Sequence, residues 1–190
     1  MKRIIFSISA VLFIQLAVFS QIVGTYLDSR DGKVYKTITI GSQTWMSENL
    51  NYVTESGSWC YNESHAACDQ FGRLYNFETA QNVCMNGWKL PEKQDFDILV
   101  EFVTKQGSVF DMLAKDGKSG FNALMSGWRG LNENYYAQGT QERFWTSSDW
   151  QNMNAWFFSM DAATNLSKTD TDNRNLGFSV RCIRIPQTKE

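Results

Sequence analysis

The sequence predicts an α+β domain in which two helices come early and a mostly antiparallel meander of short strands comes late. Residues 76–84 and the segment after Pro91 carry apolar side chains at the i, i+3, i+4 and i+7 spacings of amphipathic helices. From residue 121 onward, short alternating runs are separated by turn residues, a pattern typical of strands. Because helices and strands occupy separate parts of the chain, an arrangement of βαβ units is disfavoured.

The first twenty residues have the features of a secretory signal peptide. Lys2 and Arg3 form a basic start, and residues 4–19 are apolar apart from three polar positions. Cleavage is expected before Gln21, which leaves a lead-in at 21–27, a domain at 28–185 and a tail at 186–190. The apolar run is shorter and more polar than the about twenty residues usual for a membrane span. We expect an exported protein, either secreted or at the cell surface or outer envelope, with no transmembrane segment in the mature chain.

The remaining chain is long enough for one domain with a substantial core. Without Lys2 and Arg3 it carries 16 basic and 20 acidic side chains, a formal charge of −4. No stripe of basic residues is present, which argues against a nucleic-acid partner.

Four cysteines lie in the mature chain, and an even number in an exported protein indicates two disulfides. Three pairings are possible from the sequence, of which we favour Cys60 with Cys68 and Cys84 with Cys182. A zinc site is disfavoured because no C-x-x-C pair occurs and His65 is the only histidine.

The first elements are expected to be extended. Residues 26–40 read as a hairpin with its turn at Asp31-Gly32, and residues 43–46 resume an extended segment. Residues 47–63 are expected to be irregular, and His65 is placed in a hydrophilic loop between Cys60 and Cys68.

Two helices are expected next. The first, at 76–84, has an inward face that comprises Phe77, Ala80 and Cys84. The second, after Pro91, has an apolar stripe formed by Phe96, Leu99, Val100 and Val103. Glu92 stands where a better N-cap residue would be expected, so the start of the second helix is predicted to be loose. Residues 109–115 are expected to add a short helical turn.

The last third is expected to form strands at 144–148, 155–160 and 178–183, with a polar loop at 165–175. In the final strand, alternation places Phe178, Val180 and Cys182 inward. The same alternation places Ser179, Arg181 and Ile183 outward.

Several motifs resemble one known family. They are KVYKT at 33–37, GSQTWMSENLNY at 41–52, GSWCY at 57–61, GRLY at 72–75, CMNGWKLP at 84–91 and GFSVRCIR at 177–184. In this order they resemble the Fibrobacter succinogenes major paralogous domain, from about residue 28 to residue 184. Two of the motifs are also similar to segments of the C-type-lectin-like fold, which formylglycine-generating enzymes share.

The resemblance implies a C-type-lectin-like fold whose termini lie together and whose long irregular loops carry any ligand site. It also implies a Cys84–Cys182 bridge between a helix and the final strand. The family occurs on exported bacterial proteins and its biochemical role is largely undefined.

The candidate ligand contacts are aromatic residues in loops. Trp150 lies in a turn beside Asp149 and Asn152, and Tyr135 and Tyr136 follow an Asn-rich stretch, so exposure is expected at these positions. The predicted site comprises residues 132–136, 149–154 and 170–175. The other tryptophans are expected to fill the core: Trp45, Trp59, Trp88, Trp128, Trp145 and Trp156.

Neither a metal nor catalysis is favoured. Asp170, Asp172 and Asn173 offer oxygen ligands for calcium, but the segment lacks the glycine and terminal glutamate of an EF-hand loop, so a solvated loop is preferred. Formylglycine-generating enzymes use a reactive cysteine pair that binds copper, whereas the cysteines here are interpreted as structural. No nucleophile and base can be named, and no cofactor is expected.

The sequence therefore favours an exported, non-catalytic module that binds a polymer, either a polysaccharide or an envelope protein, through its loops. The alternatives are a purely structural cell-envelope domain without a ligand and, least favoured, an oxidase of the formylglycine-generating type.

Overall fold

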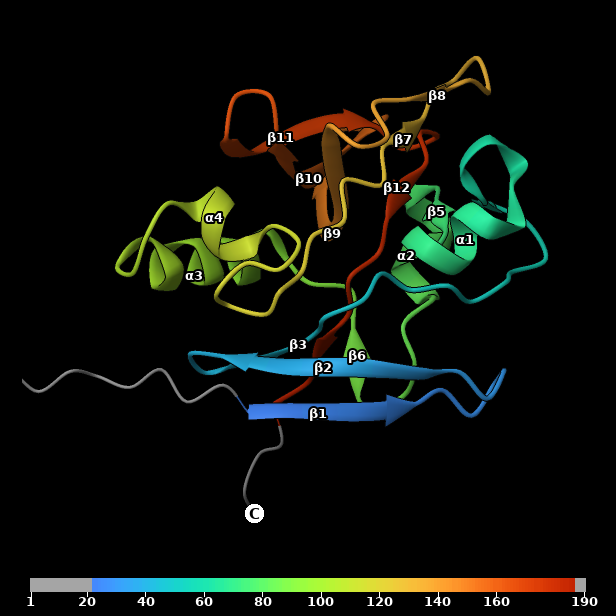
Figure 1. Cartoon of the computed structure of the whole chain (residues 1–190). Helices are drawn as coiled ribbons and strands as arrows, with labels where there is room; N and C mark the ends of the chain where they lie inside the picture. Colours follow the sequence, from blue (N-terminus) through green and yellow to red (C-terminus); the bar gives the residue numbers. More distant parts are fainter. Residues whose placement is uncertain (1–21, 187–190) are drawn as a thin grey trace, which may run out of the picture.

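A computed structural model describes residues 22–186, so the expected signal peptide and residues 187–190 lie outside the described residues (Figure 1). The described chain begins and ends in one five-stranded antiparallel sheet, ordered β1-β2-β3-β13-β6. Its strands are β1 (Ile22–Leu27), β2 (Val34–Ile40), β3 (Gln43–Met46), β13 (Ile183–Arg184) and β6 (Trp88–Lys89).

A second sheet has six strands in the order β11-β10-β9-β12-β5-β4, and all of its pairs are antiparallel except β12 with β9. The strands are β11 (Leu166–Asn173), β10 (Asn154–Asp161), β9 (Gln141–Trp150), β12 (Phe178–Ser179), β5 (Leu74–Tyr75) and β4 (Ser58–Trp59). The strands β7 (Trp128–Arg129) and β8 (Tyr135–Tyr136) form a separate small hairpin.

The helices flank the six-stranded sheet on two sides (Figure 1). One side carries α3 (Lys93–Thr104) and α4 (Val109–Leu113), and the other carries α1 (His65–Phe71) and α2 (Phe77–Asn82). A single 3-10 turn, η1 (Tyr61–Glu63), precedes α1. The predicted α+β class, with mostly antiparallel strands, is confirmed.

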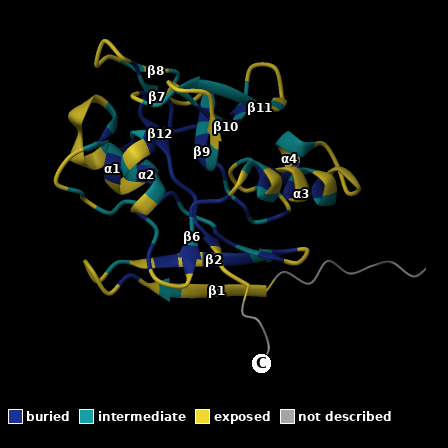
Figure 2. Cartoon of the chain, turned by 180° about the vertical axis from the view of Figure 1, so that it is seen from behind, coloured by how far each residue is buried: buried dark blue, intermediate teal, exposed yellow. Residues whose placement is uncertain are grey.

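Two hydrophobic clusters form the core. One lies around Trp145, whose ring stacks on Phe178 with centroids 4.1 Å apart. The other lies under α3, where Phe96 stacks on Phe158 at 4.7 Å and contacts Trp45 at 5.1 Å. The apolar stripe that predicted α3 therefore faces the sheet. Figure 2 shows β2 and β9 buried along much of their length, while β1 is mostly exposed.

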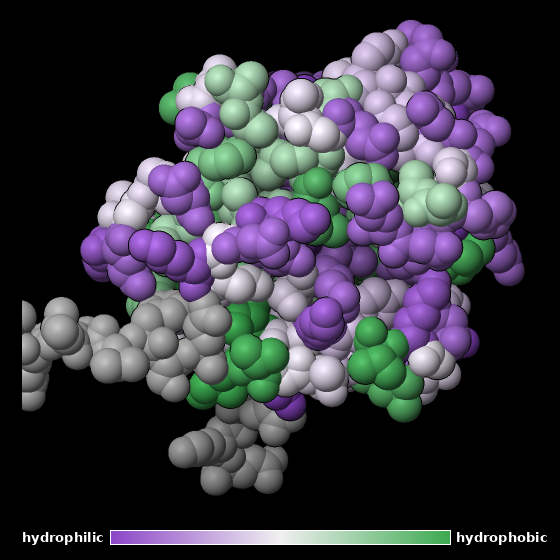
Figure 3. Space-filling model, in the orientation of Figure 1, coloured by the Kyte–Doolittle hydropathy of each residue, from purple (hydrophilic) through white to green (hydrophobic). Residues whose placement is uncertain are grey.

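The edge strand β1 carries much of the exposed apolar surface. Hydrophobic side chains gather along β1 and the start of β2 in Figure 3, where Ile22, Val23, Leu27 and Val34 are exposed. Because β1 pairs with β2 over its whole length, residues 22–27 are a strand rather than the expected lead-in, and the hairpin begins earlier than residue 26.

Both favoured disulfides are present. Cys60 is bonded to Cys68 and Cys84 to Cys182, with sequence separations of 8 and 98 residues. The long-range bond joins the segment after α2 to the chain between β12 and β13. It therefore ties together parts of the chain that contribute to both sheets.

The expected polar loop at 165–175 is wrong, because residues 166–173 form strand β11. This strand pairs with β10 in an unbroken antiparallel register from Leu166 opposite Asp161 to Asn173 opposite Asn154. As the edge of its sheet, β11 keeps both faces partly in water, so its polar side chains do not oppose strand formation.

The outward placement of Ser179, Arg181 and Ile183 is also wrong, because all three are buried. The chain crosses here from one sheet to the other, between β12 and β13, and protein surrounds it on all sides. The Arg181 guanidinium donates to the Asn49 side-chain oxygen and to the carbonyls of Met46, Phe121 and Asn122. Its burial lowers the pKa of Arg181 to about 10.

Two local expectations about helices also need correction. The N–H of Glu92 donates to the Asp95 carboxylate, and that of Lys93 to the Ser148 hydroxyl, so the start of α3 is held in place. The expected hydrophilic loop between Cys60 and Cys68 contains η1 and the first turn of α1, a short helix with weak periodicity. The short helical turn expected at 109–115 is confirmed as α4.

A candidate ligand-binding groove

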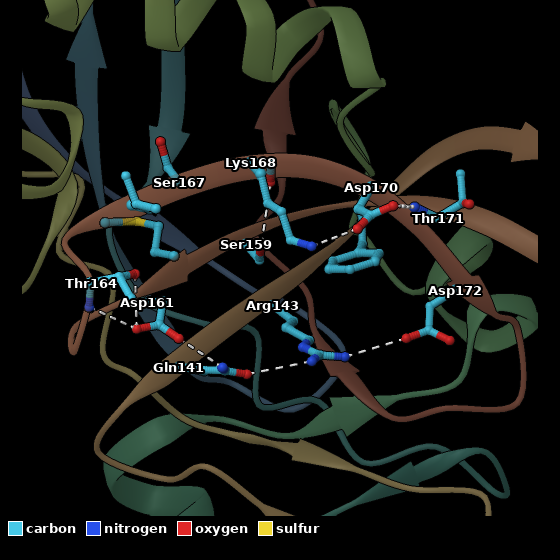
Figure 4. A pocket seen from close by; sticks show the side chains of 13 residues that line it. Gln141, Arg143, Ser159, Asp161, Thr164, Ser167, Lys168, Asp170, Thr171 and Asp172 are labelled. Carbon is cyan, nitrogen blue, oxygen red and sulfur yellow. Dashed lines mark hydrogen bonds and ion pairs between the residues drawn. The ribbon is translucent and has the colours of Figure 1, made fainter.

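A groove of about 540 Å³ lies on the face of β9, β10 and β11 that points away from α3 (Figure 4). Strand alternation and register create it. Arg143, Ser159 and Lys168 stand side by side in one row across the three strands, and Gln141, Asp161 and Leu166 form the next row. Phe144 and Phe158, which follow Arg143 and precede Ser159, point to the opposite face and into the core.

A continuous line of polar contacts runs along the groove (Figure 4). The Gln141 amide donates to Asp161 at 2.8 Å, the Arg143 guanidinium donates to Gln141 at 3.4 Å, and it also donates to Asp172 at 3.4 Å. Lys168 pairs with Asp170 at 2.6 Å. Amide, carboxylate, guanidinium and ammonium groups thus line one surface, and they supply both donors and acceptors.

Arg143 forms the floor of the groove. Its guanidinium lies 4.3 Å from the centroid of the Trp128 ring, and its side chain is 18% exposed. Burial lowers the pKa of Arg143, and Asp172 and Asp170 oppose that shift. The group stays a cation at neutral pH. Both of its hydrogen bonds are long, so a ligand oxygen of better geometry has donors to approach.

The acidic groups at the rim are held in the ionised form. Asp161 accepts hydrogen bonds from Gln141, from the Thr164 side chain and from the N–H groups of Ala163 and Thr164, which lower its pKa. The pKa of Asp170 is lowered chiefly by Lys168. At neutral pH these carboxylates are therefore acceptors and carry no proton to donate.

The predicted aromatic residues separate into three environments. The ring of Tyr136 stacks on Trp128 at 4.6 Å and so supports the floor of the groove from behind Arg143. Tyr135 points elsewhere and packs against Tyr61 at 5.2 Å. Burial raises the pKa of Tyr135.

Trp150 lies away from the groove. Its ring meets Trp156 at 5.1 Å, and Trp156 belongs to the face of β10 that points toward α3. Trp150 and Asp149 end strand β9 rather than lying in the expected turn, which comprises residues 151–153. Asp149 forms an ion pair with Arg174, and Asn152 in the turn is exposed. The structure therefore does not unite Trp150 with Tyr135 and Tyr136 in one site.

The calcium candidates are on β11. Asp170 and Asp172 line the groove, but their carboxylates pair with Lys168 and Arg143, and Asn173 accepts the N–H of Asn175. Within residues 22–186, no three His, Cys, Asp or Glu side chains are placed to hold a metal ion.

Of the six tryptophans expected in the core, Trp45, Trp88 and Trp145 are buried, whereas Trp59, Trp128 and Trp156 are half-buried. Each half-buried ring has a cation over its face: Arg129 on Trp59, Arg143 on Trp128 and Lys93 on Trp156. These three rings link the core to the surface.

Sequence reasoning missed Gln141, Arg143, Ser159, Asp161 and Lys168. A signal was present: Ser159 and Asp161 interrupt an apolar strand, and Gln141 and Arg143 alternate with buried positions. Recognising the groove required the partner strand β11, which was expected to be a loop.

The fold and the groove define a small, disulfide-bonded α+β domain with an open, polar-lined sheet face. The chain belongs to the family of the Fibrobacter succinogenes major domain, whose family model matches residues 38–184. Comparison with curated proteins and with solved structures gave no match. Across residues 22–186, none of the helices combines the length and the apolar character that crossing a membrane requires.

Proposed function

We propose that this domain is an exported, non-catalytic module that binds a glycan polymer in the groove of β9, β10 and β11. The observation that carries the proposal is the floor of the groove, where Arg143 is stacked on Trp128 and flanked by Gln141 and Asp172. A sugar chain presents many hydroxyl groups, each both donor and acceptor, and the groove offers complementary groups in a line.

The balance of charge favours a neutral chain over a strongly charged one. Three carboxylates line the groove, Asp161, Asp170 and Asp172, against two cations, Arg143 and Lys168. A polyanion would meet these carboxylates, and a polycation would meet Arg143 on the floor. Apolar surface from the exposed Leu166 is available to the C–H faces of sugar rings.

The proposal that the domain is not catalytic rests on the protonation state of the groove carboxyl groups and on the disulfide bonding of the cysteines. Cleavage of a glycosidic bond by paired carboxyl groups needs one with a raised pKa to donate a proton, and those of Asp161 and Asp170 are lowered. All cysteines of the described chain are in disulfides, which argues against a reactive thiol pair of the formylglycine-generating type.

Export and fold type complete the proposal. The signal-like residues 1–20 and the two disulfides support an oxidising compartment outside the cytoplasm. We further propose that the fold is C-type-lectin-like. Support comes from the return of the described chain to its starting sheet and from the Cys84–Cys182 bond between the α2 region and the last strands.

The test is to fill the groove without removing its core contacts. Ser159→Trp places an indole between Arg143 and Lys168, and Thr25→Trp is the matched control, on an exposed strand position of the other sheet. Binding of the oxidised protein to a panel of neutral and acidic polysaccharides is measured by affinity electrophoresis. We expect retardation by a neutral polysaccharide that Ser159→Trp abolishes and Thr25→Trp preserves.

Equal retardation of both variants would show that the groove is not the site. If the unmodified protein binds no polysaccharide but binds envelope protein in a way that Ser159→Trp abolishes, the polymer is a protein. Absence of either binding favours the purely structural alternative.

A further inference from the structure

An exposed aromatic surface lies on the face of β10 opposite the groove, beside α3. Trp150 and Trp156 meet edge to face at 5.1 Å with an interplanar angle of 73°. Trp150, the last residue of β9, is 42% exposed, and Met153 in the turn that follows is 60% exposed. Single exposed apolar side chains are common on protein surfaces, whereas Trp150, Trp156 and Met153 together form a patch, and a patch of this kind is informative.

Polar groups border this aromatic pair. Lys93 lies with its ammonium nitrogen 5.6 Å from the Trp156 ring centroid and pairs with Asp97 at 2.7 Å. Lys93, Asp97, Gln94 and Ser148 line a shallow depression of about 610 Å³ along the start of α3. A flat apolar ring beside carboxylate, amide and hydroxyl groups matches a pyranose, which has an apolar C–H face and a polar hydroxyl edge.

The surrounding charge selects among possible occupants. Glu92, Asp97 and Glu101 line the depression, and Lys93 is its only cation among the described residues. An acidic rim disfavours an anionic membrane surface and an acidic polysaccharide through like-charge repulsion. A neutral sugar meets no such cost.

We propose that Trp150 and Trp156 form a second, separate stacking site for a neutral pyranose. The groove lies on the Arg143 face of the strands and the tryptophan pair on the α3 face, so the two sites do not overlap. The existence of the second site is independent of the groove. If the groove also binds a glycan, as the proposed function states, one domain can hold two glycan chains and cross-link them. This last step therefore rests on the proposed function.

The experiment titrates the oxidised full chain with neutral β-linked glucose and mannose hexasaccharides, with a galacturonic acid hexasaccharide as the charged comparison. Calorimetry gives the stoichiometry, and tryptophan fluorescence reports the indole site. We expect two neutral hexasaccharides per chain. Trp150→Ala should weaken one site about tenfold or more and remove the part of the fluorescence change that accompanies binding at that site. Trp150→Phe, which keeps an aromatic ring, should retain much of the affinity.

The groove variant Ser159→Trp separates the two proposals. Loss of one site in Trp150→Ala and of the other in Ser159→Trp supports both. If only Trp150→Ala loses a binding site, the tryptophan site is supported and glycan binding in the groove is refuted. If only Ser159→Trp loses a binding site, the groove is supported and the tryptophan site is refuted. The inference is overturned if Trp150→Ala keeps the wild-type stoichiometry and fluorescence change, or if no neutral hexasaccharide binds the unmodified protein.

Discussion

The two disulfides should differ clearly in their contribution to stability. Cys84 and Cys182 are 98 residues apart, whereas Cys60 and Cys68 are 8 apart. In the chain-entropy treatment, a cross-link stabilises the fold by restricting the unfolded chain, and the effect grows with the logarithm of loop length. It gives about 4.7 kcal/mol for the long loop and about 2.6 kcal/mol for the short one, a difference of about 2 kcal/mol.

Packing in the folded state should also make the Cys84–Cys182 disulfide the more stabilising of the two. Cys182 is fully buried within the larger core cluster, so its replacement also removes apolar contacts. The short disulfide joins the residue before η1 to the middle of α1, and the Arg73 guanidinium is 3.4 and 3.5 Å from its two sulfur atoms. Its loss leaves the connection between the two sheets intact.

The assay is reversible urea unfolding of the double variants Cys84→Ala with Cys182→Ala and Cys60→Ala with Cys68→Ala, followed by fluorescence and circular dichroism. We expect the first pair to lose about 4 kcal/mol or more of the free energy of unfolding and the second about 2–3 kcal/mol. Equal losses, or a larger loss from the short loop, would refute the reasoning from loop length.

Three further predictions concern single residues. Burial raises the pKa of Glu142 above its ordinary value of 4.5, so the folded state binds that proton more tightly than the unfolded chain does. Its contribution to stability is thus full below pH 4.5 and is lost as pH rises toward the raised pKa. Urea titrations should show that Glu142→Gln flattens this fall, and an unchanged slope would contradict the assignment. Asn76→Ala removes the side-chain acceptor for the Thr79 N–H at the start of α2 and should cost about 1 kcal/mol in the same assay, while no loss would exclude a capping role. Phe96→Ala empties the site beneath α3 and should cost about 3–5 kcal/mol; a loss below about 1 kcal/mol would mean that the cluster collapses into the space.

Much of the fold follows from local patterns in the sequence. The stripe of Phe96, Leu99 and Val103 predicted α3 because helical periodicity and burial coincide there. Alternation predicted parts of β9 and β10 for the same reason, and the compartment implied by residues 1–20 favoured disulfides.

The predictions failed where the structure depends on pairing between distant strands or on the passage of the chain from one sheet to the other. Segment 166–173 is a strand because β10 supplies its hydrogen bonds, a fact that its own polar residues conceal. Arg181 is buried because oxygen atoms of four residues that are distant in the sequence surround its guanidinium, so alternation within its own segment was misleading.

In the candidate site, too, local features could be predicted from the sequence, whereas the spatial arrangement of the residues could not. Trp150 was recognised as exposed from its turn, and Asp170 and Asp172 were recognised as a polar group. That the two aspartates lie beside Arg143, and that Trp150 lies on the opposite face of the sheet, depends on strand register.

The most direct test of glycan binding in the groove is a nuclear magnetic resonance titration of the nitrogen-15-labelled, oxidised protein with the neutral hexasaccharides. We expect the backbone amide signals of residues 141–143, 159–161 and 166–172 to shift in a saturable way, and Ser159→Trp to remove those shifts while Thr25→Trp keeps them. Shifts confined to other parts of the chain, or no saturable shift with any neutral hexasaccharide, would contradict binding in the groove.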